Sequence, residues 1–82
     1  MTQKIETFDW TEVTGLDADS NYMLQAQLTD NFRLGQAMWI QSATEPQSDD
    51  LGIMADTIKL SGATKVYVKV TILPTMIVAQ AV

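Results

Sequence analysis

The strongest structural signal in the chain is the run of residues 65–82, Lys-Val-Tyr-Val-Lys-Val-Thr-Ile-Leu-Pro-Thr-Met-Ile-Val-Ala-Gln-Ala-Val. In its first part valine recurs at every second position, a period typical of a half-buried strand. Its last residues, 76–82, are apolar except for Gln80. β-Branched residues dominate both parts, and such side chains fit a pleated, half-buried surface. The run therefore predicts two strands joined at residues 73–75.

Further strands are predicted upstream of this run. Residues 22–28 and 32–41 carry a period-two pattern. The Thr-Asp-Asn sequence between them is typical of a turn, because Asx side chains hydrogen-bond to their own backbone. These segments predict a hairpin, with Gly35 marking a bulge or a close backbone approach. Residues 53–60 contain another short strand around residues 57–60, and a brief helical turn at residues 53–56 is the alternative.

Polar segments rich in glycine, proline, serine and aspartate separate these strands and predict loops. The longest, residues 42–52, is near the length at which an irregular loop usually has a role of its own. We expect the core to form from one face of each strand, although a slip of one residue would exchange the two faces of residues 32–41. The predicted core residues are Tyr22, Leu24, Leu28, Met38, Ile40, Ile58, Val66, Val68, Val70, Ile77 and Val78.

The predicted fold class is all-β: a small antiparallel β-sandwich or barrel of about five to seven short strands. Residues 14–82 form this single domain. Residues 1–13 precede it as an extended arm or first strand, because Thr, Phe, Trp and Val favour an extended segment. A helix is the alternative, since Ile5 and Phe8 lie three residues apart.

The size of the chain predicts self-association. A domain of 82 residues buries only a little over ~60% of its unfolded surface, so its stability is marginal. The sequence contains no cysteine for disulfides and no histidine for a structural zinc site. Partner subunits are the remaining means of stabilisation, and a homotrimer or similar oligomer is expected.

The charge of the chain argues against nucleic acid as a partner. Ten acidic residues face five basic ones, for a net charge of −5, whereas phosphate binding depends on clustered basic side chains. The first residues lack the apolar core of a secretory signal. No run approaches the ~18 apolar residues that a membrane span needs. We therefore expect a protein made in the cytoplasm that binds neither nucleic acid nor membrane.

The sequence offers no motif for catalysis, and we predict that the protein is not an enzyme. It has no histidine, no nucleophile elbow and no phosphate-binding glycine loop. Residues 17–21 resemble the start of a calcium loop, but Tyr22 and Leu28 occupy the positions that require Gly and Glu. A weaker calcium site is conceivable from the acidic residues of a second region, although solvated loops are commonly acidic. Those residues are Glu45, Asp49, Asp50 and Asp56. No cofactor or metal is predicted.

Four apolar side chains are candidates for a partner interface: Phe8, Trp10, Val13 and Trp39. Aromatic residues are typical anchors of desolvated interfaces. They also commonly fill the core of a small domain. A further alternative is a carbohydrate-binding β module, in which Trp10 and Trp39 would stack on sugar.

Three segments resemble small β-sandwich structural proteins of tailed-bacteriophage virions. They are Tyr-Met-Leu-Gln-Ala-Gln at 22–27, Ala-Met-Trp-Ile-Gln-Ser-Ala-Thr-Glu-Pro at 37–46 with Gly52 beyond it, and Lys-Val-Tyr-Val-Lys-Val at 65–70. The resemblance implies a virion protein without catalytic residues, often trimeric, made in the host cytoplasm.

The function implied by the resemblance is that of a capsid decoration or cement protein, which binds the major capsid protein and stabilises the head surface. A tail, neck or fibre accessory protein that binds a tail protein is the alternative. A small regulatory or adaptor domain is a further class that the residues leave open.

Overall fold

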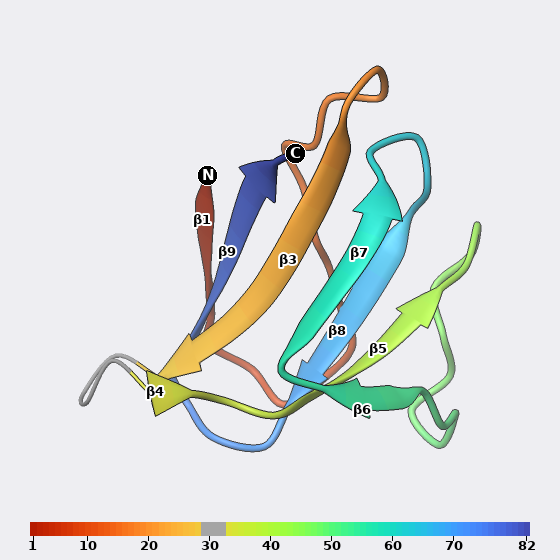
Figure 1. Ribbon diagram of the computed structural model, residues 1–82. Helices are drawn as coiled ribbons and strands as arrows, with labels where there is room; N and C mark the ends of the chain where they lie inside the picture. The colour runs from red at the N-terminus through yellow and green to blue at the C-terminus, as the bar shows by residue number, and fades with distance from the viewer. Residues whose placement is uncertain (29–32) are drawn as a thin grey trace.

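The computed structural model describes residues 1–28 and 33–82, so the predicted turn at 29–31 lies outside the described residues. Within these two ranges the chain forms nine strands and no helix (Figure 1), and thus no helix that could cross a bilayer. The all-β prediction is confirmed; the two strands beyond the expected seven are the two-residue β2 and β4. The strands are β1 (Thr2–Ile5), β2 (Thr11–Glu12), β3 (Asn21–Leu28), β4 (Arg33–Leu34), β5 (Ala37–Gln41), β6 (Ile53–Ala55), β7 (Thr57–Ser61), β8 (Val66–Val70) and β9 (Thr75–Ala81).

The strands form two antiparallel sheets that pack as a β-sandwich. The five-stranded sheet has the order β1-β9-β3, with β7 and β4 both pairing with the remaining edge of β3. The four-stranded sheet has the order β2-β8-β5-β6. The two strands predicted from residues 65–82 are β8 and β9, and they belong to different sheets, connected by the loop at 71–74.

The predicted strand at 32–41 is wrong as a single element, because the chain changes sheet within it. β4 pairs with β3 as the second strand of a hairpin, whereas β5 pairs with β6 and β8 in the other sheet. Gly35 lies at this change, where its N–H donates to the Ala26 carbonyl at 2.9 Å. A Cβ on Gly35 would lie 3.1 Å from Leu28 Cδ2, so the predicted close approach is confirmed.

The short strand predicted around residues 57–60 is confirmed as β7, and residues 53–55 form a further strand, β6, in place of the alternative helical turn. β6 belongs to the four-stranded sheet and β7 to the five-stranded sheet. Asp56 lies between them, and its carbonyl accepts a hydrogen bond from Ala26 N at 2.9 Å. The chain therefore crosses from one sheet to the other at a single residue, which places β6 and β7 on the same side of the sandwich.

The core lies between the two sheets. Leu24, Val66, Val68, Val70 and Ile77 are buried as predicted, and Tyr22 and Ile58 pack partly buried against them. Three predicted core residues, Met38, Ile40 and Val78, are wrong, because they lie on the outer faces of their strands. The fourth, Leu28, is half-buried. The inward residues of β5 are Ala37 and Trp39 in place of Met38 and Ile40, and β9 directs Ile77 and Ala79 inward in place of Val78.

The register with β8 explains the reversal in β5. Trp39 pairs with Val68 and Ala37 pairs with Val70. Residues directly opposite each other on neighbouring strands share a face. Since the valines of β8 face the core, Ala37 and Trp39 must face it as well.

The N-terminal segment is part of the sandwich. β1 forms the edge of the five-stranded sheet beside β9, and β2 forms the edge of the four-stranded sheet beside β8. The Gln3 side chain joins these edges: its Nε2 donates to the Glu12 carbonyl at 3.1 Å and its Oε1 accepts from Thr14 N at 3.0 Å. This side of the sandwich is therefore closed by hydrogen bonds between the sheets.

Candidate binding groove

The opposite side of the sandwich, bordered by β6 and β7, presents two strand edges. Among the described residues β6 pairs with β5 and β7 pairs with β3, and neither strand has a second neighbour. Antiparallel residues direct their backbone groups alternately toward and away from the paired strand. The hydrogen bond from Ala26 N to Asp56 O fixes this alternation, so Ile58 faces β3. The N–H and C=O groups of Thr57 and Lys59 therefore point outward.

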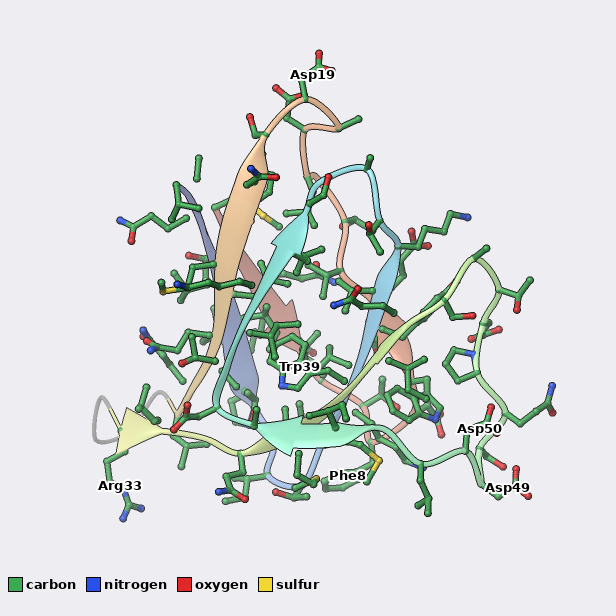
Figure 2. All side chains as sticks on the ribbon, turned by 45° about the vertical axis from the view of Figure 1, so that its right-hand side comes forward. Phe8, Asp19, Arg33, Trp39, Asp49 and Asp50 are labelled. Atoms are coloured by element: carbon green, nitrogen blue, oxygen red, sulfur yellow. The ribbon has the colours of Figure 1, made fainter. Side chains whose placement is uncertain are left out.

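A groove with a volume of about 620 Å³ lies on this open side. Its lining is mainly apolar, and it comes from β5, from the end of the 42–52 loop with the start of β6, and from β7. The lining residues are Trp39, Ile40, Gln41, Leu51, Gly52, Ile53, Ile58 and Lys59. Figure 2 shows Trp39 between the strands of the two sheets. Its indole Nε1 donates to the Ala55 carbonyl at 2.9 Å, which ties β5 to the last residue of β6.

Gly52 sets the shape of the rim. A Cβ at this position would lie 2.4 Å from the Trp39 carbonyl oxygen, so only glycine allows the loop to approach β5 this closely. The two residues that flank Gly52 are Leu51, which is 86% exposed, and Ile53, which is 70% exposed. Monomeric proteins rarely expose apolar side chains in contiguous patches, and such patches commonly mark interaction sites. The groove and its rim therefore form a candidate binding surface.

The charged groups around the groove differ in sign. Lys59 lies exposed on the groove's lining and adds a positive charge to this apolar surface. Asp49 and Asp50 lie in the 42–52 loop, just before the rim residue Leu51 in the sequence (Figure 2). The Asp50 carboxylate accepts a hydrogen bond from Gln47 N at 2.7 Å, so it helps to close the loop.

The four predicted interface residues occupy three different environments. Trp39 is 2% exposed, and Val13 is also part of the core. Trp10 is 6% exposed and lies on the outer face of β8, where Lys69 Nζ is 5.8 Å from the centre of its ring. Phe8 is 52% exposed in the connection between β1 and β2. Of the four, Trp39 lines the groove and Phe8 offers an exposed side chain elsewhere.

The arrangement gives no support to sugar stacking by the two tryptophans. Trp39 faces the core from β5, whereas Trp10 lies on the opposite face of the same sheet, beside Lys69. The loop at 42–52 covers the Trp10 side, and Lys69 Nζ donates to the Ser48 carbonyl at 2.8 Å. The two indoles therefore share no exposed face on which a sugar ring could stack.

The acidic loops serve local hydrogen bonding. The Asp17 carboxylate accepts from Asp19 N at 2.9 Å, at the tip of the loop labelled by Asp19 in Figure 2. Across residues 1–28 and 33–82, no three His, Cys, Asp or Glu side chains gather as metal ligands would. The four acidic residues considered for a weak calcium site, Glu45, Asp49, Asp50 and Asp56, therefore do not form such a cluster.

Sequence reasoning missed Leu51, Ile53 and Lys59 as site residues. The available signal was the sequence Leu-Gly-Ile at 51–53, in which two large apolar residues flank a glycine at the end of a polar loop. The role of Lys59 depends on the pairing of β7, which sequence alone does not show.

In the comparisons with known proteins, no family model, no curated protein and no solved structure matches the chain. The residues and the geometry of the groove are therefore the basis for inferring a function.

Proposed function

We propose that this protein is a structural protein of a bacteriophage virion, a capsid decoration protein that binds the head surface through the groove. The observation that carries the proposal is the apolar groove with its exposed rim residues, Leu51 and Ile53. Each large apolar side chain that a partner covers contributes roughly 1.5–3 kcal/mol through the hydrophobic effect. This surface is suited to a protein partner, and on this proposal the protein is not an enzyme.

The virion setting is supported by the resemblance of residues 22–27, 37–46 and 65–70 to small virion β-sandwich proteins. The acidic charge of −5 supports a protein partner rather than nucleic acid. The major capsid protein is the proposed partner, and a tail protein is the alternative.

A second surface supports the proposed homotrimer or similar oligomer. The connection at 6–10 and the loop at 71–74 lie at the same end of the sandwich (Figure 1). They expose Phe8, Ile72 and Leu73. Because none of these three residues lines the groove, subunits associate through Phe8 and its neighbours on this proposal while the groove binds the capsid.

The location is tested by mass spectrometry of purified particles of the phage that encodes the chain. A copy number close to that of the major capsid protein is the expected result for a decoration protein. A dozen or so copies would assign the protein to the tail or neck instead. Complete absence from the particles would overturn the virion proposal.

The role of the groove is tested by binding of the purified protein to particles stripped of it. Leu51→Asp and Ile53→Asp place a charge on the rim and are expected to abolish binding. Leu34→Asp is the matched control, because Leu34 is 51% exposed and lies outside the groove lining. If the rim variants and the control bind equally well, the groove is not the capsid-binding surface.

The role of Phe8 is tested by Phe8→Asp, with the mass of the purified protein in solution measured by light scattering. A single exposed substitution is preferable to truncation of the segment, because residues 1–13 contribute Ile5 and Val13 to the core. The variant is expected to be a folded monomer. If the parent chain is itself monomeric, or if the variant keeps the oligomeric mass of the parent, self-association through this end is refuted.

A further inference from the structure

We propose that the groove binds its partner as an extended segment, which adds to the five-stranded sheet as a new strand along β7. The inference rests on the proposed function for the site, and it names the chemistry of the partner. The segment carries apolar side chains at every second position and an acidic side chain next to Lys59.

The backbone of β7 is the first part of the argument. Thr57 and Lys59 direct their N–H and C=O groups to the open side, as the alternation set by Ala26 and Asp56 requires. Exposed strand edges are templates for pairing with another chain. In this mode main-chain hydrogen bonds supply affinity, and pockets for alternate side chains supply specificity. The edge of β7 therefore offers the hydrogen bonds that a strand-shaped partner needs.

The groove is the second part of the argument. A strand beside β7 directs every second side chain toward the interior of the sandwich, as β7 itself does with Ile58 and Leu60. On the open side this direction leads into the groove lined by Ile58, Trp39 and Ile53. The inward positions of the partner segment must therefore be apolar. The volume of about 620 Å³ has room for more than one such side chain.

The charge at the rim selects the outward positions of the partner. Lys59 lies on the outer face of β7, opposite Met23, and is exposed. An opposite charge directly across from it stabilises a strand pair, whereas a like charge destabilises the pair. A carboxylate at this position of the segment is therefore favoured.

Two other occupants fit less well. A second copy that pairs β7 with β7 brings no carboxylate to Lys59, because β7 contains no acidic residue, and the register centred on Lys59 places two lysines opposite each other, which is unfavourable. The terminal strands β1 and β9 are held in the five-stranded sheet, where they pair with each other and with β3 and not with β7. Met1 N donates to the Ala79 carbonyl at 2.9 Å, and Val82 N donates to the Asn21 carbonyl at 3.0 Å. A segment of a different protein is thus the occupant that the charges and the connectivity favour.

A display library of random peptides tests the inference on the purified protein, without virions. Peptides of about nine residues are long enough to span β7. Selection is expected to enrich apolar residues at every second position with an acidic residue between them. Selection on Lys59→Glu is expected to replace the acidic residue by Lys or Arg. Enrichment without this period, no enrichment, or an unchanged charge preference would overturn the proposal.

The best selected peptide then tests the backbone hydrogen bonds directly. N-methylation of peptide residues whose N–H groups face β7 is expected to weaken binding at least tenfold, whereas methylation of the intervening residues leaves it within about twofold. Amide exchange at Thr57 and Lys59 is expected to slow on binding. Equal effects of the two methylation patterns, with unchanged exchange at these amides, would show that no strand is added.

The two proposals fail separately. The copy number in purified particles decides whether the protein belongs to a virion. Peptide selection and amide exchange decide whether β7 accepts a strand, whatever protein supplies it.

Discussion

The two buried tryptophans, Trp39 and Trp10, differ in the hydrogen bonding of their indole N–H groups. Both are buried, at 2% and 6% exposure. Trp39 Nε1 donates to the Ala55 carbonyl at 2.9 Å, whereas among the described residues Trp10 Nε1 has no hydrogen-bond partner. We predict that Trp39→Phe destabilises the fold more than Trp10→Phe, because only the first substitution removes a hydrogen bond.

The predicted difference in the free energy of unfolding follows from the hydrogen bond of Trp39. Both substitutions remove the same atoms from a buried site, so the packing losses are of similar size. Trp39→Phe also leaves the Ala55 carbonyl without its donor, which costs about 1–3 kcal/mol. Trp10→Phe instead removes a buried N–H without a partner, and so relieves an unfavourable group. For a chain of 82 residues the total stability is about 4–12 kcal/mol, so the difference is a large fraction of it.

The measurement is urea unfolding of both variants, followed by the fluorescence of the tryptophan that each one retains. The free energies of unfolding are expected to differ by about 1–3 kcal/mol, and the melting temperatures by about 4–24 °C. Circular dichroism of the native state serves as the control that both variants fold. Equal stabilities, or a less stable Trp10→Phe variant, would refute the assignment of the Trp39 hydrogen bond.

Three further substitutions test a close backbone approach and two sets of hydrogen bonds that hold the sandwich and its loops together. Gly62→Ala places a Cβ 1.9 Å from the Asp17 carbonyl oxygen, so thermal unfolding is expected to show a loss of about 2–3 kcal/mol; an unchanged melting temperature would contradict this contact. Gln3→Ala removes two hydrogen bonds between the sheet edges, so the free energy of unfolding in urea is expected to fall by about 1–3 kcal/mol. An unchanged free energy would show that the Gln3 side chain does not join the edges. Lys69→Met keeps an apolar stem but loses the bond to the Ser48 carbonyl, so amide exchange is expected to accelerate in the 42–52 loop while exchange in β8 stays slow. Slow exchange in that loop after the substitution would show that Lys69 does not hold it.

The class of fold follows from the sequence alone. Valine at every second position in residues 65–70, and the β-branched residues that follow, favour extended backbone whatever they pack against. The loop at 42–52 could be recognised because its polar, proline- and glycine-containing composition acts on the local backbone. The close approach at Gly35 was also predictable, since glycine within a strand pattern commonly marks one.

The buried face of each strand, and the sheet that each strand joins, depend on contacts between segments far apart in the chain. Period two defines two faces of β5, but only the pairing of Trp39 with Val68 selects the inward one. Both crossings, at Gly35 and at Asp56, hydrogen-bond to Ala26, and Asp56 lies thirty residues from it in the sequence. The groove exists because the second crossing brings β6 and β7, edges of different sheets, to the same side. Local sequence cannot specify such a site, because its walls come from segments that only packing brings together.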